Sequence, residues 1–196
     1  QREAIGKQRR AVLVEGNFDL LALVAGGFEP VAAPLGTALT REQVRRLKPM
    51  VDEVVLFFDG DAAGVKAAER AAPFFLAEQV SARVVLLPET HDPDSFIREK
   101  GVGAVEQLVD RAKTLAEFVV QQLMDRHGLS LDGKSKILED LTPLMNSAAS
   151  KAQRSMMAAH FSEILGIDPE MLMTGSSRRN AAPPEMARDE IESVKA

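Results

Sequence analysis

The feature that most constrains the fold is the dense apolar run at residues 53–58 (EVVLFF). Such a run suits a strand that is covered on both faces, which is typical of parallel sheets. Further strand candidates are residues 11–15, 30–34 and 82–87. Helical patterns separate them at residues 19–26, after Thr40 and at 62–79. The order β-α-β-α-β-α-β predicts the α/β class, with a mostly parallel sheet and helices on both faces.

Local signals mark where several helices begin or end. Thr40 and Gln43 fit a capping box at the start of one helix. Gly26-Gly27 is a natural stop for the helix before it. Pro73 lies inside the Ala-rich helix at residues 62–79 and is a point where that helix could be interrupted.

From about residue 102 the pattern changes to helical periodicity, and no further strand is expected. Successive amphipathic helices cover the chain to residue 173, with Gly128 and Gly133 in one connection. Residues 174–196 are polar and contain Pro, so they are expected to form a disordered tail or linker.

The composition excludes several functions. The chain of 196 residues has no Cys, Tyr or Trp. Without Cys there is no disulfide framework, thiolate zinc site or cysteine nucleophile, and without Tyr there is no covalent tyrosine link to DNA. The net charge of −5 argues against a grip on duplex nucleic acid by electrostatics alone. No apolar run approaches the roughly 18 residues of a membrane helix, so a cytoplasmic location is expected.

Acidic residues follow directly on three of the predicted strands. They are Glu15, Asp59, Asp61, Asp92 and Asp94. The carboxyl ends of parallel strands meet at one edge of a sheet, so these side chains should gather there. Hard divalent cations such as Mg²⁺ prefer oxygen ligands, and neighbouring carboxylates raise each other's pKa unless a cation neutralises them. The pattern therefore predicts a magnesium site that acts on phosphates.

Several of these acids also have a structural explanation. Asp61 and Asp92 are good N-caps, and Pro93 favours a first helical position. Asp94 complements a helix dipole, and Asp19 either supports the metal site or is simply an early acidic residue of its helix. The residues alone leave both explanations open.

Taken together, these motifs resemble the Toprim domain of bacterial DNA primases. The segments that carry the resemblance are Glu15-Gly16 with Asp19, Leu35-Gly36-Thr37-Ala38, Asp59-Gly60-Asp61 with Ala63-Gly64, and Leu87-Pro88-Glu89 with Asp92-Pro93-Asp94. The glutamate and the Asp-x-Asp form the general Toprim signature, which type IA and II topoisomerases and some nucleases share. The LGTALT and LPE…DPD segments are more particular to primases. The resemblance is close over residues 11–101.

The resemblance implies a Toprim metal-binding catalytic domain at residues 1–112 and a small all-helical subdomain of the RNA-polymerase core at 113–173. The implied activity is that of a DNA-directed RNA polymerase, which makes short RNA primers on single-stranded DNA from ribonucleoside triphosphates. The implied catalytic metal ligands are Glu15, Asp59 and Asp61, with Asp19, Asp92 and Asp94 as further metal-site acids. The implied cofactor is Mg²⁺, for which Mn²⁺ can substitute.

Some features depart from the family. Asn17-Phe18 stand where the family usually has Tyr-Met, and His91 stands where a basic residue often precedes the DPD element. A bacterial primase also has a zinc module, a basic N-terminal part of the core and a helicase-binding domain. The chain is therefore expected to be a fragment that makes little primer alone and that meets the replicative helicase through a region absent from it.

Basic residues are weaker candidates, for contact with nucleic acid or phosphate. They are Arg9, Arg10, Arg41, Arg45, Lys48 and Lys66. A solvated helix face is the alternative for Arg41, Arg45 and Lys48. Two other functions stay open, namely a Toprim nuclease that uses the same acids and a non-catalytic module of a replication assembly.

Overall fold

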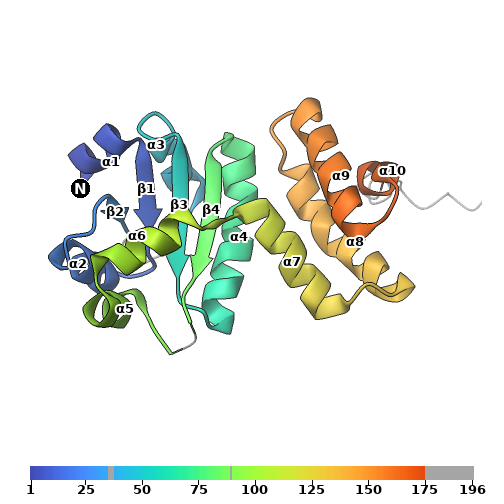
Figure 1. Cartoon of the computed structure of the whole chain (residues 1–196). Helices are drawn as coiled ribbons and strands as arrows, with labels where there is room; N and C mark the ends of the chain where they lie inside the picture. Colours follow the sequence, from blue (N-terminus) through green and yellow to red (C-terminus); the bar gives the residue numbers. More distant parts are fainter. Residues whose placement is uncertain (35–37, 89, 175–196) are drawn as a thin grey trace, which may run out of the picture.

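The computed structural model describes residues 1–34, 38–88 and 90–174, and it consists of a five-stranded sheet beside a group of helices (Figure 1). The strands are β1 (Arg10–Leu13), β2 (Val31–Ala32), β3 (Glu53–Phe58), β4 (Ser81–Leu86) and β5 (Lys113–Thr114). Their order in the sheet is β2-β1-β3-β4-β5. The first four strands are parallel, and β5 runs antiparallel to β4. The predicted mostly parallel sheet is confirmed.

The sheet is buried on both faces because its central strands have apolar side chains on each face. In β3, Val54, Leu56 and Phe58 pack in one hydrophobic cluster. Val55 and Phe57 pack in a second cluster on the other face. Side chains alternate across a strand, so one unbroken apolar run fills the interior on both sides of the sheet.

Helices cover the two faces in two groups, as predicted. The helices packed on the face of Leu56 are α1 (Arg2–Gln8), α3 (Arg41–Leu47), α4 (Ala62–Glu78) and α7 (Leu115–His127). Those on the face of Phe57 are α2 (Asn17–Ala25), α5 (Pro93–Lys100) and α6 (Val102–Asp110). The connections β2–β3 and β3–β4 therefore cross on the face of Leu56, while β1–β2 and β4–β5 cross on the face of Phe57.

The remaining helices lie beyond α7 and share the core of the sheet. They are α8 (Leu131–Asn146), α9 (Lys151–Leu165) and α10 (Pro169–Thr174). Ile137, Leu141 and Phe161 are fully buried in the same cluster as Phe75 of α4. Figure 1 shows α7 between the sheet and these helices, and it packs against both α4 and α8. The sheet and the helical part thus share one hydrophobic interior.

Several local predictions are confirmed. Gln43 N donates to Thr40 Oγ1 (3.3 Å), and Thr40 N donates to Gln43 Oε1 (2.8 Å), so the capping box begins α3. The helix α2 ends at Ala25, with Gly26 as its C-cap. The strand β3 spans the predicted residues 53–58.

Two predictions about helix breaks are wrong. The helix α4 runs through Pro73 without interruption, and the residues on either side of Pro73, Ala72 and Phe75, are buried in the core. Gly133 lies inside α8 rather than in the connection before it. A Cβ atom there would lie 2.4 Å from the carbonyl oxygens of His127 and Gly128, so glycine allows the first turn of α8 to pack against the end of α7.

Two elements have no counterpart in the predictions. The expectation of no strand after residue 102 is wrong, because Thr114 and Lys113 of β5 pair with Arg83 and Val84 of β4. Both side chains of β5 are exposed, so no apolar pattern marks it. The short helix α1 buries only Ile5.

Some predictions fall outside the described part of the chain. These concern residues 35–37 of the LGTALT loop, Glu89 of the LPE segment and residues 175–196 of the expected tail. The domain boundary between residues 112 and 113 stays a prediction. In the described part, no helix combines the length and the apolar character needed to cross a membrane.

Candidate active site

The predicted acidic residues lie at the carboxyl edge of the sheet, where the parallel strands end. They are Glu15 and Asp19 after β1, Asp59 and Asp61 after β3, and Asp92 and Asp94 after β4. Figure 1 shows the arrowheads of β1, β3 and β4 pointing to this edge, beside α5. The topology therefore brings together acids from three separate segments of the sequence.

Partial burial and mutual repulsion raise the pKa of two carboxyls that directly follow strands. Loss of hydration is the largest cause for Glu15, and the negative charges of Asp59, Asp61 and Asp19 raise its pKa further. Loss of hydration is also the largest cause for Asp59, to which Asp19, Asp92 and Asp61 add. A carboxylate whose charge is unfavourable in this way gains free energy from a nearby cation.

Asp19 connects the acids after β1 with those after β4. Burial is the main reason that its pKa is raised, and the charges of Asp92 and Asp94 act in the same direction. A hydrogen bond from Gly16 N to Asp19 Oδ2 (3.1 Å) lowers the pKa but does not reverse the shift. Asp19 thus serves both its own helix start and the electrostatics of the acidic edge.

Capping of helices is confirmed for two of the acids. Asp61 Oδ1 accepts hydrogen bonds from Ala63 N (2.9 Å) and Gly64 N (2.8 Å) at the start of α4. Asp92 Oδ1 accepts one from Ser95 N (2.7 Å) at the start of α5, and its hydrogen bonds with Ser95 lower its pKa. Capping occupies only Oδ1 of Asp61. Its Oδ2 accepts no hydrogen bond from any residue that the structure describes.

Glu15 and Asp59 differ from the capping acids because neither has a neutralising partner. Across residues 1–34, 38–88 and 90–174, no hydrogen bond or ion pair reaches either carboxylate. They follow β1 and β3, which are adjacent in the sheet. Two unpaired carboxylates on neighbouring strand ends form the part of this edge that structural roles do not explain.

Asp94 has an oxygen that is only partly satisfied. Arg98 Nε lies 2.8 Å from Asp94 Oδ1, but this buried oxygen has no hydrogen bond of acceptable geometry within the described residues. An unsatisfied buried carboxylate oxygen is unfavourable, and a cation is a chemically suitable partner for it. The donor set at this edge, which consists of carboxylate oxygens, fits a hard divalent ion.

The acids do not converge into a ready-made metal cluster. Among the described residues, no group of three or more His, Asp or Glu side chains approaches closely enough to hold a metal ion. The structure therefore gathers the acids within electrostatic range of one another, while the predicted set of metal ligands stays a prediction.

Close packing against α4 fixes the backbone of Asp59. A Cβ atom on Gly64 would lie 2.1 Å from Asp59 O and 3.1 Å from the carbonyl carbon. No side chain fits there, because a backbone carbonyl cannot move aside as a flexible side chain can. Gly64 therefore lets the first turn of α4 lie directly against the end of β3.

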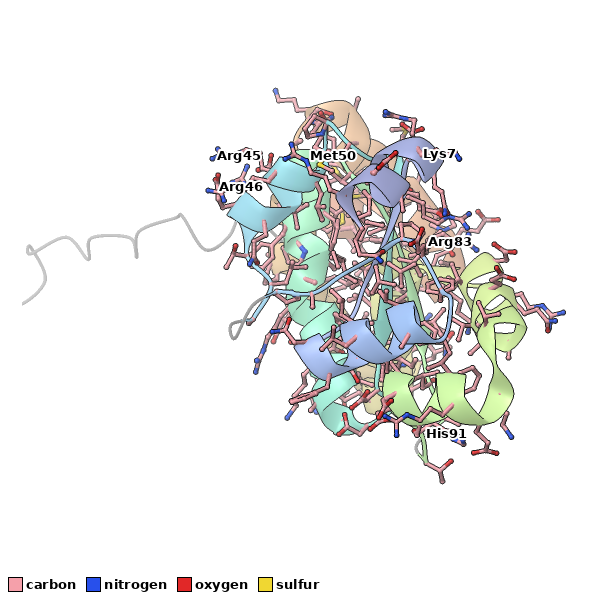
Figure 2. The ribbon with its side chains drawn as sticks, turned by 90° about the vertical axis from the view of Figure 1, so that its left-hand side faces the viewer. Lys7, Arg45, Arg46, Met50, Arg83 and His91 are labelled. Carbon is pink, nitrogen blue, oxygen red and sulfur yellow. The ribbon has the colours of Figure 1, made fainter. Side chains whose placement is uncertain are left out.

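Most of the predicted basic residues are paired with acids away from the acidic edge. The pairs are Arg9 with Asp52, Arg10 with Glu53 and Asp110, Arg41 with Glu78, and Arg45 with Glu42. Figure 2 shows Arg45 at the opposite end of the molecule from His91, which precedes Asp92. Lys48 and Lys66 have no partner in the part of the chain that is described. Of the predicted basic residues, Lys66 lies closest in sequence to Asp61.

His91 is held by its neighbours. Its Nε2 lies 2.8 Å from Glu99 Oε2, and its Nδ1 lies 2.8 Å from Thr90 Oγ1. The ring also meets Phe96 edge-on, with the ring centroids 5.6 Å apart. These contacts show a structural role for His91 at the start of α5.

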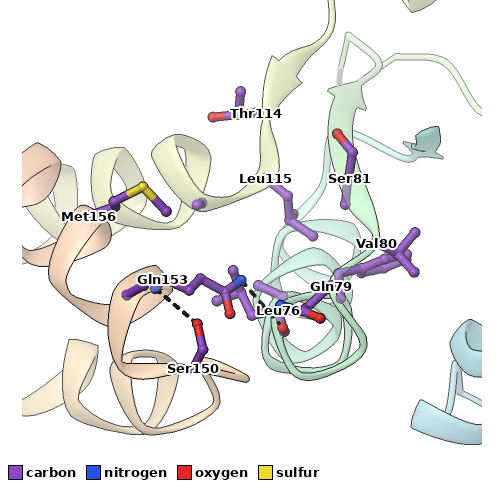
Figure 3. A pocket seen from close by; sticks show the side chains of 14 residues that line it. Leu76, Gln79, Val80, Ser81, Thr114, Leu115, Ser150, Gln153 and Met156 are labelled. Carbon is purple, nitrogen blue, oxygen red and sulfur yellow. Dashed lines mark hydrogen bonds between the residues drawn. The ribbon is translucent and has the colours of Figure 1, made fainter. Parts of the chain in front are cut away.

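Two cavities differ in their relation to the acids. One, of about 460 Å³, is lined by Glu15. The other, of about 430 Å³, lies between the last turn of α4, the start of β4 and the first turns of α7 and α9 (Figure 3). Gln153 Nε2 donates to Leu76 O across this second cavity (3.4 Å), and no charged residue lines it. Only the first cavity adjoins the acidic edge.

Comparison with protein families assigns both parts of the chain. Residues 12–97, which include the acidic edge, match the Toprim-like family. Residues 116–170 match the DnaB-helicase binding domain of primase. A DNA primase of Neisseria meningitidis is 37% identical over 176 residues, which are 87% of this chain.

The chain belongs to the DNA primase family.

Solved primase structures match the fold as well. A DNA primase domain from Pseudomonas aeruginosa is 34% identical, with a TM-score of 0.79 over 89% of this chain and 57% of that one. A DnaG primase catalytic domain bound to single-stranded DNA is 30% identical, with a TM-score of 0.74 over 86% of this chain and 55% of that one. The chain spans 30% of the length of the Neisseria relative, so it corresponds to a fragment of such a primase.

The second family match changes one prediction. The helicase-binding part was expected in a region absent from the chain, whereas the match places a helicase-binding family on the helices from α7 to α10. Helical periodicity predicts those helices correctly but carries no information about their partner. The primase match over the same helices also confirms that they accompany the Toprim region.

Proposed function

We propose that this primase fragment holds the catalytic metal ions for RNA primer synthesis on single-stranded DNA. The observation that carries the proposal is the pair of unpartnered carboxylates, Glu15 and Asp59, with raised pKa values at adjacent strand ends. They lie within the region that matches the Toprim-like family. The reaction class is nucleotidyl transfer from ribonucleoside triphosphates, which makes the whole enzyme a DNA-directed RNA polymerase.

The residues that would hold the metal are Glu15, Asp59 and the free oxygen of Asp61. When bound, Mg²⁺ supplies charge that activates the 3′-hydroxyl of the primer and stabilises the leaving pyrophosphate. Mn²⁺ is expected to substitute, because it also accepts carboxylate ligands. Asp19, Asp92 and Asp94 raise the negative potential that attracts the ion, and Asp19 keeps Gly16 in place beside Glu15.

The helical part supports a second role, in assembly. Its match to a helicase-binding family supports contact with the replicative helicase, and the solved relative with single-stranded DNA supports a single-stranded template. We propose that primer synthesis by the whole enzyme takes place in the bacterial cytoplasm. Because the chain matches only part of its relatives, we propose that the fragment alone makes little or no primer.

Calorimetric titration with Mn²⁺ tests the metal site. We expect saturable binding to the wild-type chain and at least tenfold weaker binding to Glu15→Gln and Asp59→Asn, because each change removes a ligand charge and keeps the side-chain shape. The matched controls are Glu139→Gln and Asp132→Asn on α8, which lie outside the acidic edge. Equal binding by all five proteins would refute the proposed site.

Two further assays test the reaction class. Single-stranded DNA with labelled ribonucleotides should yield little primer from the fragment, so strong priming would contradict its dependence on other parts. Cleavage of a labelled oligonucleotide in Mn²⁺, lost in Asp59→Asn, would instead identify a Toprim nuclease.

A further inference from the structure

A cavity of about 460 Å³ opens beside Glu15, and three alanines of α4 line one side of it. Ala63, Ala67 and Ala71 form this alanine wall, since residues four apart lie on the same face of a helix. Phe58 at the end of β3 closes the cavity from within. Alanines leave room where longer side chains would fill the space, so α4 presents an apolar surface next to the acidic edge.

The cavity also carries a positive charge without a partner. Arg70 lines it, and no hydrogen bond or ion pair joins Arg70 to any described residue. Its sequence neighbour Glu69 is occupied, because Glu69 Oε1 accepts from Arg126 Nη2 at 2.6 Å. Lys66, one turn before Arg70 on α4, is exposed and likewise unpartnered across the described ranges. This contrasts with Arg9, Arg41 and Arg98, each of which pairs with an acid.

We propose that Arg70, with Lys66 beside it, binds a phosphate group of a nucleotide whose apolar part lies against the alanine wall of α4. The proposal rests on the proposed function, because the same nucleotide would approach the metal held near Glu15. A guanidinium group suits phosphate because its fork of donors matches two phosphate oxygens. The cavity volume also falls within the roughly 300–1,000 Å³ of small-molecule sites.

Arg70 lies nine residues after Asp61, which at 1.5 Å per residue places their backbones about 13 Å apart along α4. The long arginine side chain covers part of that distance, and Arg70 and Glu15 line the same cavity. The phosphate that Arg70 contacts therefore belongs either to the nucleoside triphosphate that approaches the metal or to the adjoining unit of a nucleic-acid strand. Arg70 is a positioning residue in both cases.

The test measures binding of two probes to the 196-residue chain in Mn²⁺. The first probe is a fluorescent ribonucleoside triphosphate, and the second is a labelled single-stranded oligonucleotide. Arg70→Gln should weaken at least one of them about tenfold to a hundredfold, as expected for the loss of a charged hydrogen bond. Arg70→Lys should retain part of the affinity. The probe that weakens identifies the source of the phosphate.

A matched control is Arg111→Gln, since Arg111 lies at the end of α6, away from the cavity, and is also unpartnered where the structure is described. Its affinity for both probes should stay unchanged. Ala67→Leu provides a second variant that fills the cavity without a change of charge, and it should weaken the same probe. For the oligonucleotide, Arg70→Gln should also reduce the dependence of log affinity on log salt by about 0.7.

The outcomes separate this inference from the proposed function. Unchanged affinity in Arg70→Gln, or no binding of either probe by the wild-type chain, overturns the role of Arg70. If Mn²⁺ still binds the wild type and not Glu15→Gln, the metal site is supported even though the role of Arg70 is refuted. Weak Mn²⁺ binding that is the same in the wild type, Glu15→Gln and Asp59→Asn overturns the metal site instead.

Discussion

The contact between Gly64 and Asp59 makes a sharp prediction about both stability and metal binding. Gly64→Ala places a Cβ atom 2.1 Å from Asp59 O, well inside any van der Waals separation. The first turn of α4 must then move away from the end of β3. Because Asp61 caps that same turn through Gly64 N, the movement displaces two of the proposed metal ligands at once.

The size of the effect follows from two opposing terms. Alanine improves the helix propensity by about 1 kcal/mol over glycine. Overpacking against a rigid neighbour costs typically about 1–3 kcal/mol and sometimes more. Since the neighbour here is a backbone carbonyl, we expect a net loss of about 1–3 kcal/mol in the free energy of unfolding. For a chain of this size, each kcal/mol lowers the Tm by about 2–4 °C.

The same substitution at Gly103 of α6 is the matched control. Apart from its chain neighbours and the adjacent backbone of α6, nothing lies within 4 Å of a Cβ atom built there, so Gly103→Ala gains propensity without a clash. It should raise the Tm by about 2–4 °C and leave Mn²⁺ affinity unchanged. Gly64→Ala should lower the Tm and weaken Mn²⁺ binding about 10–100-fold, as changes in the support of metal ligands do. A Gly64→Ala variant that melts at or above the wild type and binds Mn²⁺ normally would refute this reasoning.

Two other predictions concern stability. The double variant Glu15→Gln/Asp59→Asn should be more stable than the metal-free wild type at pH 7, because folding raises both pKa values and the ionised carboxylates therefore destabilise the fold. The wild type gains stability as the pH falls through the raised pKa values, so the melting temperatures of the two proteins should converge toward pH 4. A double variant that is less stable than the metal-free wild type at pH 7 would contradict the expected direction of the effect. Ser150→Ala removes the oxygen that accepts from Gln153 N (3.1 Å) at the start of α9; denaturant unfolding should show a loss of about 1 kcal/mol, while calorimetry should show unchanged Mn²⁺ binding.

The sequence was most informative for features that depend on neighbouring residues, such as strands and helix caps. The run at residues 53–58 suits a strand covered on both faces, because it is short, dense in apolar residues and rich in Val and Phe. Thr40, Asp61 and Asp92 cap helices as their positions predict, since capping depends on a few neighbouring backbone groups. The gathering of the acids at one edge followed from the order of strands and helices.

The features that the sequence did not show depend on distant parts of the chain. The strand β5 is held by backbone pairing with β4 and buries neither of its side chains. Arg45 and Asp61 could not be placed at different ends without the tertiary structure. Arg70 was overlooked because its significance lies in a cavity and in a missing partner, although its spacing from Asp61 and the alanines of α4 were visible.

The single hydrophobic interior has a consequence for regulation. Phe75 on α4, whose N-cap is Asp61, packs in the same cluster as Phe118 of α7 and Phe161 of α9. The acidic edge and the helicase-family helices should therefore unfold together. By linkage, any protein that binds only the folded form of those helices also stabilises the acidic edge, by an amount set by its concentration relative to its Kd. Binding of a partner to the helices α7 to α10 would thus be measurable as protection of the acidic edge against unfolding. No movement of the chain between the two regions is required.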